Sequence, residues 1–115
     1  MAPPTVSTHV LDAALGRPAA GVGVRLERAD GTVVGEGRTD EDGRLGDLGG
    51  LGDAGDAGGL ATGRHRLVLA TGEWFAEQGR DTFYPEVVVT FTLGEGHHHV
   101  PLLLSPFAYS TYRGS

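Results

Sequence analysis

Cysteine and lysine are both absent from this chain of 115 residues. The lack of cysteine excludes disulfides, thiolate zinc ligands and a cysteine nucleophile, and it is compatible with a reducing compartment. The nine basic residues are all arginine, so Schiff-base chemistry and other reactions of a lysine amine are excluded as well. Any catalytic group must therefore be an imidazole, a carboxylate, a guanidinium or a hydroxyl.

An excess of positive charge and a long apolar run are missing too. The formal charge is −6 at pH 7 and the arginines are scattered. We therefore expect neither nucleic acid nor a membrane as a partner, because binding phosphate groups requires a basic surface. The opening residues Met1-Ala2-Pro3-Pro4 lack the basic and apolar regions of a signal peptide. These features predict a cytoplasmic protein, and the length predicts a single domain over residues 1–115.

Three common catalytic and phosphate-binding motifs do not occur either. The sequence contains no Gly-x-Ser-x-Gly, no Gly-x-x-x-x-Gly-Lys and no His-Glu-x-x-His. This removes the nucleophile elbow, the phosphate-binding loop and the helical zinc site from consideration.

Short segments rich in β-branched residues, separated by glycine, proline and aspartate, are what the sequence does contain. This spacing is typical of an all-β sandwich, and 20 glycines suit its many turns. The strands that this pattern predicts cover residues 5–11, 21–27, 32–39, 44–45, 64–70, 85–93 and 97–104. One short helix is expected to begin near Trp74, after an N-cap within residues 71–73, and to end at Gly79.

Two acidic, glycine-rich segments are weakly similar to calcium loops. Residues 40–43, Asp-Glu-Asp-Gly, match the opening of an EF-hand loop, but the glutamate at its twelfth position and the flanking helices are missing. Residues 49–53, Gly-Gly-Leu-Gly-Asp, place their aspartate one position early for a calcium repeat, and the unit does not recur. We interpret the first segment as a plain acidic turn and residues 46–63 as a long surface loop.

Alternation along the last long strand places two histidines on one face. The apolar residues at positions 100, 102 and 104 form the core face, so His97 and His99 project from the opposite face. His98 lies between them on the core side near the strand end, where we expect a packed or solvated bystander and not a catalytic residue. By the same rule His9 projects away from the core face that residues 6, 8 and 10 form in the first strand.

Spacing alone leaves three interpretations of His97 and His99 open. They could bind a metal ion, with His9 or His65 and carboxylates as the further ligands. They could act as acid and base without a metal, because imidazole titrates near neutral pH. They could also belong to a solvated polar face of the strand. Arg44 taken alone would be a charge on an edge strand.

Several segments, taken in their order along the chain, together resemble the 5-hydroxyisourate hydrolases, the transthyretin-related proteins. The matching segments are residues 7–12, 16–19, 39–45, 83–86 and 97–106 and the closing tetrapeptide Tyr112-Arg113-Gly114-Ser115. This tetrapeptide is the hallmark of the family. The resemblance implies a transthyretin-like β-sandwich of two four-stranded sheets with one short helix, assembled as a homotetramer that is a dimer of dimers.

The resemblance also implies an activity and its residues. The reaction would be hydrolysis of 5-hydroxyisourate to 2-oxo-4-hydroxy-4-carboxy-5-ureidoimidazoline in urate degradation, with no cofactor and no metal. The implied catalytic residues are His9, Arg44, His99 and Ser115, and the implied substrate-binding residues are His97, Tyr112, Arg113 and Gly114. Strict alternation separates Tyr112 and Gly114 from Arg113 and Ser115. Either a bend at Gly114, or contact through the terminal carboxylate and a neighbouring subunit, would let both pairs take part in the site.

Two other functions stay open beside hydrolysis. A non-catalytic, transthyretin-like protein that binds a small ligand has the same fold, although such a protein does not need paired histidines, an arginine and this closing tetrapeptide. A metal-binding sandwich would use His9, His97 and His99 as ligands.

Overall fold

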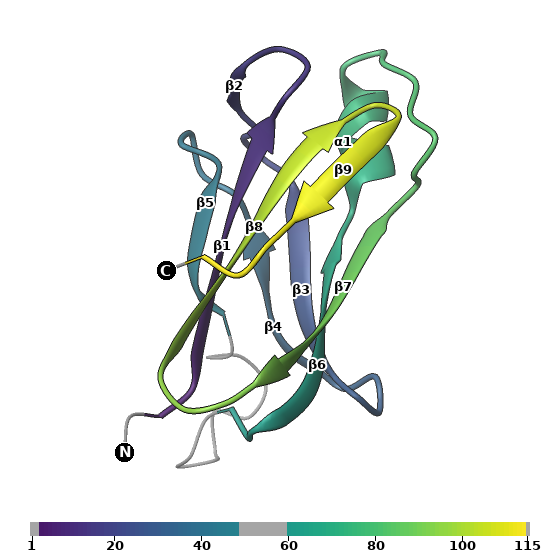
Figure 1. Ribbon diagram of the computed structural model, residues 1–115. Helices are drawn as coiled ribbons and strands as arrows, with labels where there is room; N and C mark the ends of the chain where they lie inside the picture. Colours follow the sequence, from purple (N-terminus) through teal and green to yellow (C-terminus); the bar gives the residue numbers. More distant parts are fainter. Residues whose placement is uncertain (1–2, 49–59, 115) are drawn as a thin grey trace.

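Two β-sheets packed face to face and one short helix make up the structure (Figure 1). The computed structural model describes residues 3–48 and 60–114. The first sheet contains β1 (Thr5–Asp12), β2 (Arg17–Pro18), β5 (Arg44–Leu48), β8 (His97–Ser105) and β9 (Ala108–Thr111). The second sheet contains β4 (Val33–Arg38), β3 (Gly23–Arg28), β6 (Gly63–Leu69) and β7 (Val87–Leu93), in that order.

The expected sandwich of two sheets is confirmed, but the strand count is right only for the second sheet. The first sheet has five strands instead of four, because the two-residue β2 and the longer β5 both pair with β1. β2 pairs with Leu11 and Asp12, while β5 pairs with the stretch from Val6 to His9. A pairing of only two residues is too short to give a periodic pattern, so residues 17–18 are not among the predicted strands.

β1 and β8 are neighbouring parallel strands, and they pair along the whole length of β1. The register runs from Thr5 opposite His97 to Asp12 opposite Leu104. Parallel neighbours need a long connection, and here the whole second sheet lies between them in the chain. This register places Ser7 opposite His99.

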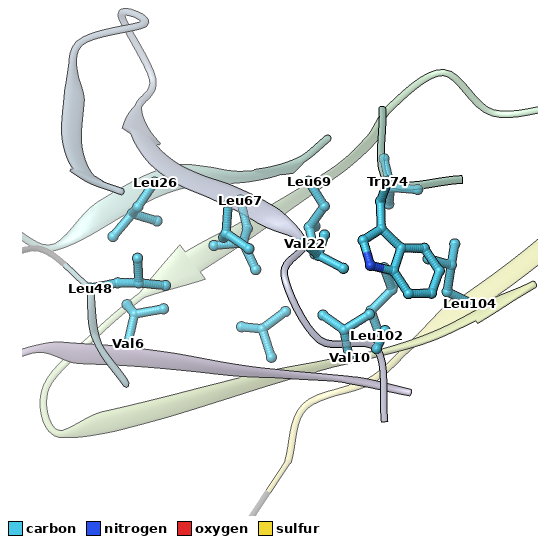
Figure 2. Close-up of a cluster of buried hydrophobic side chains, with 14 of the residues drawn as sticks. Val6, Val10, Val22, Leu26, Leu48, Leu67, Leu69, Trp74, Leu102 and Leu104 are labelled. Carbon is cyan, nitrogen blue, oxygen red and sulfur yellow. The ribbon is translucent and has the colours of Figure 1, made fainter. Parts of the chain in front are cut away.

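The core lies between the two sheets and follows the alternation of the strands (Figure 2). Val6 and Val10 from β1 are fully buried, as are Leu67 and Leu69 from β6. The core faces predicted for residues 6, 8 and 10 and for residues 100, 102 and 104 are confirmed, and Val22, Val24 and Leu26 are buried as well. The opposite face of the first sheet is therefore left for polar residues.

The helix α1 spans Thr71–Glu77, so it begins three residues before the expected Trp74 and ends before Gly79. The expected side-chain cap is also wrong: the N-cap is Ala70 and makes no side-chain hydrogen bond. Instead the Gly72 N–H donates to the carbonyl of Pro85 at 2.9 Å, so a distant segment supplies the partner that a cap would give. Gly79, at φ 68°, follows the helix as expected.

The expected loop over residues 46–63 is shorter at its start, because β5 continues to Leu48. The calcium-like segment at residues 49–53 lies outside the described residues. Across residues 3–48 and 60–114, no helix has the length and apolar character that crossing a bilayer requires.

A buried ion pair joins the end of β1 to the segment after α1. Asp12 is only 1% exposed, and its carboxylate accepts a hydrogen bond of 2.8 Å from Arg80 and further bonds from the N–H groups of Ala14 and Leu15. Burial raises the pKa of Asp12, but the Arg80 hydrogen bond and the backbone donors together hold this pKa below its ordinary value of 3.8. The pair fixes the end of the strand that carries His9.

Replacing Arg80 with methionine should lower the free energy of unfolding by about 3 kcal/mol at pH 7, because it leaves a buried carboxylate without its cation. Asp12 stabilises the fold above pH 3.8, and this contribution is lost as pH falls through its lower folded pKa. The variant should therefore also lose less stability in acid. Urea unfolding measures both effects. Arg17→Met is the matched control at an exposed arginine, and an equal loss in the control would contradict the expectation.

Candidate active site

The outer face of the first sheet gathers the polar side chains that alternation assigned to it. β1 supplies Ser7 and His9, β8 supplies His97 and His99, and β5 supplies Arg44 at the edge. His9 and Arg44 are directly opposite each other in the antiparallel pair of β1 and β5. The structure therefore brings three of the four predicted catalytic residues to one face.

The turn over residues 40–43 positions Arg44. One carboxylate oxygen of Asp40 accepts hydrogen bonds of 2.9 Å from the N–H groups of Asp42 and Arg44. Gly43 has a φ of +78°, and a Cβ there would collide with the carbonyl oxygen of Val10. This geometry agrees with the interpretation of the segment as a plain turn, because the Asp40 oxygen already binds backbone donors.

His9 is held by the same turn. Its Nε2 lies 2.9 Å from the carbonyl oxygen of Asp42. A carbonyl can only accept, so Nε2 carries the proton and Nδ1 keeps its lone pair. No described residue forms a hydrogen bond with this Nδ1, which leaves His9 free to accept a proton there.

Ser7, which the sequence analysis did not single out, contacts both outward histidines. Its Oγ lies 2.8 Å from His99 Nδ1 and 2.8 Å from His97 Nε2. The other ring nitrogen of His97, Nδ1, lies 2.7 Å from Thr5 Oγ1. The available signal was the strand parity that Ser7 shares with His9, but the parity did not reveal that β8 would lie beside this part of β1.

His98 behaves as expected and is packed on the core side. It is 7% exposed, its Nε2 accepts a hydrogen bond from the N–H of Gly94, and its Nδ1 donates to the carbonyl of Gly96. Both ring nitrogens are therefore used by backbone groups.

His99 is kept neutral by its surroundings. Burial is the largest cause that lowers the pKa of His99 below 6.5, and the nearby His9, His97 and Arg44 lower it further. Arg44 is exposed and makes no ion pair with any described residue. The site thus combines an unpaired guanidinium with a neutral imidazole, which suits binding of a polar group and acceptance of a proton.

The closing tetrapeptide returns to His99. The isolated bridge of Gly114 to His99 keeps the register of the β8–β9 ladder, and the Gly114 N–H donates to the His99 carbonyl at 2.8 Å. Tyr112 and Arg113 lie outside any strand and line a pocket of about 220 Å³ together with His99. Residues 112–113 therefore interrupt this ladder, and pairing resumes at Gly114 in the same register. Ser115 lies outside the described residues.

This pocket is distinct from the space between His9 and Arg44. His9 and Arg44 are absent from its lining, which includes Val89 and Phe91 of the second sheet. Among the catalytic candidates that the structure describes, His99 is the one that lines this pocket.

Metal binding by the three outward histidines has no support in the geometry. Among residues 3–48 and 60–114, no group of three or more histidine, cysteine, aspartate or glutamate side chains could hold a metal ion. Both ring nitrogens of His97 contact hydroxyl groups, which leaves this residue without a free ligand atom.

Comparison with known proteins identifies the family of this chain. The model of the HIUase/Transthyretin family matches residues 6–114. The chain belongs to this family. A 5-hydroxyisourate hydrolase of Salmonella dublin is 43% identical over an alignment that covers 96% of this chain and 80% of that protein.

Two solved structures of the family also match the fold. A 5-hydroxyisourate hydrolase of Klebsiella pneumoniae has a TM-score of 0.85 and 39% identity, with all of both chains covered. A sea bream transthyretin in complex with thyroxine has a TM-score of 0.79 and 30% identity, with 95% of this chain and 93% of that chain covered. The fold is therefore shared by relatives with an enzymatic name and by a hormone-binding protein.

Replacing Gly114 with alanine should displace the His99 ring. A Cβ at this position would lie 2.6 Å from His99 Cδ2, and overpacking of this kind costs about 1–3 kcal/mol. NMR signals of the His99 imidazole should shift and the midpoint of thermal unfolding should fall. Gly23→Ala is the matched control, since its Cβ would meet only Ala70 at an ordinary 3.6 Å. Unchanged His99 signals in Gly114→Ala would refute the contact.

An NMR titration of the His99 ring should give a pKa below 6.5. Replacing Arg44 with glutamine removes one of the positive charges that lower the pKa, so the pKa of His99 should rise. It should stay below 6.5, because burial is the larger cause and is unchanged. A pKa that does not respond to Arg44→Gln would show that the two side chains are not electrostatically coupled.

Proposed function

We propose that this protein hydrolyses 5-hydroxyisourate to 2-oxo-4-hydroxy-4-carboxy-5-ureidoimidazoline in urate degradation. The observation that carries the proposal is the meeting of His9, His99 and Arg44 on one sheet face, where Arg44 forms no ion pair with any described residue. The names of the Salmonella and Klebsiella relatives support the same reaction. No metal or cofactor is part of the proposed mechanism.

In the proposed reaction, water adds to a carbonyl carbon of the cyclic amide. A neutral imidazole, at His9 Nδ1 or at His99, takes the proton from the water as the new C–O bond forms. Arg44 binds the carbonyl oxygen and the negative charge that develops on it. The C–N bond of the ring then breaks, the imidazolium returns a proton to the departing nitrogen, and the product carries a new carboxylate.

The other predicted residues are proposed to hold the substrate. Tyr112 and Arg113 line the pocket that reaches His99, and Gly114 leaves space for the His99 ring. Ser115 follows directly in the sequence, so its side chain and carboxylate are proposed to complete the site. His97 is proposed to support the substrate site from the rim of the sheet.

We also propose a homotetramer, built as a dimer of dimers, with the outer face of the first sheet turned inward. β7 and β9 are edge strands, and large apolar side chains near them are exposed, including Phe83 at 72% and Phe107 at 68%. Exposed apolar surface of this kind favours subunit contact. A second subunit would close the site around one substrate.

The alternative is a non-catalytic protein that binds a small ligand in the same place. The likeness to sea bream transthyretin, a structure in complex with thyroxine, is the observation that favours it. The hydrolase is the better supported function, because a carrier has no use for several imidazoles beside an arginine that forms no ion pair with any described residue. Binding without turnover in the assay below would favour the carrier.

The decisive assay generates 5-hydroxyisourate from urate with urate oxidase and follows its decay with and without this protein. The wild-type protein should accelerate the decay. His9→Asn and His99→Asn should each lower kcat/KM by about 10²–10⁴-fold, and Arg44→Gln by about 10²–10³-fold. Arg64→Gln, at an exposed arginine of the second sheet, is the control. Sedimentation should give four chains for every variant, and wild-type rates in all three would refute the assignment.

A further inference from the structure

The contacts of Ser7 form a continuous chain of hydrogen bonds from the site to the rim of the sheet. The chain runs from His99 Nδ1 through Ser7 Oγ to His97 Nε2, and from His97 Nδ1 to Thr5 Oγ1. Its three distances lie between 2.7 and 2.8 Å. His99 is partly buried, whereas His97 and Thr5 are exposed, so the chain links the buried imidazole to solvent.

The register of β1 and β8 makes this chain a consequence of the backbone. Thr5 lies opposite His97 and Ser7 lies opposite His99 in the parallel pair. All four side chains therefore project from the same sheet face. A hydroxyl at position 7 is the only side-chain group within hydrogen-bond distance of both imidazoles among the described residues.

A serine hydroxyl has one proton, so the chain can be polarised in two directions. In the first direction His99 Nδ1 donates to Ser7, Ser7 donates to His97 Nε2, and His97 Nδ1 donates to Thr5. His99 Nε2 then has a free lone pair. In the second direction every bond is reversed, and His99 Nε2 carries a proton. In both directions the two histidines have the same tautomer.

We propose that Ser7 is a positioning residue that relays protons between His99 and His97, so that His99 changes from base to acid without keeping a positive charge. The proposal rests on the proposed hydrolysis and deepens it. When Nε2 takes a proton from water, the Nδ1 proton passes to Ser7 Oγ and the Ser7 proton passes to His97 Nε2. His97 then releases its Nδ1 proton at the rim, and the reverse sequence supplies a proton to the departing nitrogen.

The charges around His99 are the reason that a relay is useful. His9, His97 and Arg44 all disfavour a cation at this position, and Arg113 lines the pocket that His99 shares. A proton that stayed on His99 would therefore be energetically unfavourable. Moving it to the exposed His97 places the charge where water can solvate it.

Kinetics of two variants test the relay in the assembled protein. Ser7→Ala should lower kcat by about 10–100-fold with KM nearly unchanged, because the relay acts on the proton transfer and not on binding. Ser7→Thr keeps the hydroxyl and should restore most of kcat. In mixtures of H₂O and D₂O, the rate should vary non-linearly with the deuterium fraction in the wild type and linearly in Ser7→Ala. Ser105→Ala, at the far end of β8, is the matched control.

The outcomes separate this proposal from the proposed function. If the wild type accelerates the decay and Ser7→Ala is equally fast, the relay is wrong and the hydrolase stands. If the wild type does not accelerate the decay, the proposed function is wrong, and NMR still tests the chain itself. Nitrogen shifts should report one shared tautomer at His97 and His99, which Ser7→Ala uncouples. Opposite tautomers in the wild type would overturn the relay.

Discussion

The parallel pairing of β1 with β8 is the constraint on which the site depends. It sets Ser7 against His99 and Thr5 against His97, so both outward imidazoles find hydroxyl partners on a neighbouring strand. The same pairing buries Val10 and Leu102 on the inner face. Core packing and site geometry are therefore fixed by one register, since a slip of one residue would exchange the two faces.

Burial and charge then set the chemical properties of the residues on this face. The chain has no lysine, and its site cation is Arg44, which makes no ion pair with any described residue. Its charge and the burial of His99 both favour a neutral imidazole. A guanidinium that binds developing negative charge and an imidazole that accepts a proton are complementary, and they must lie close together to act on one carbonyl.

Two positions of the site are occupied by glycine because distant parts of the chain approach their backbone closely. Gly43 packs against the carbonyl of Val10 and allows the turn that presents Arg44 and the carbonyl bonded to His9. Gly114 lies under the His99 ring, where a methyl group would collide. Each glycine permits a contact between segments far apart in the sequence, and at Gly114 this contact is made by the backbone of the closing tetrapeptide.

The amino-acid pattern was enough to predict the all-β class, the core faces of the long strands and the outward direction of His97 and His99, because alternation is a local property of a strand. The family resemblance at His9 and in the closing tetrapeptide was visible there too. The bridge of Ser7 to two histidines, the fifth strand β2 and the start of α1 at Thr71 became visible in the folded chain. These features depend on partners distant in the chain, and pairing between distant segments is set by packing of the whole sandwich, which no local pattern encodes.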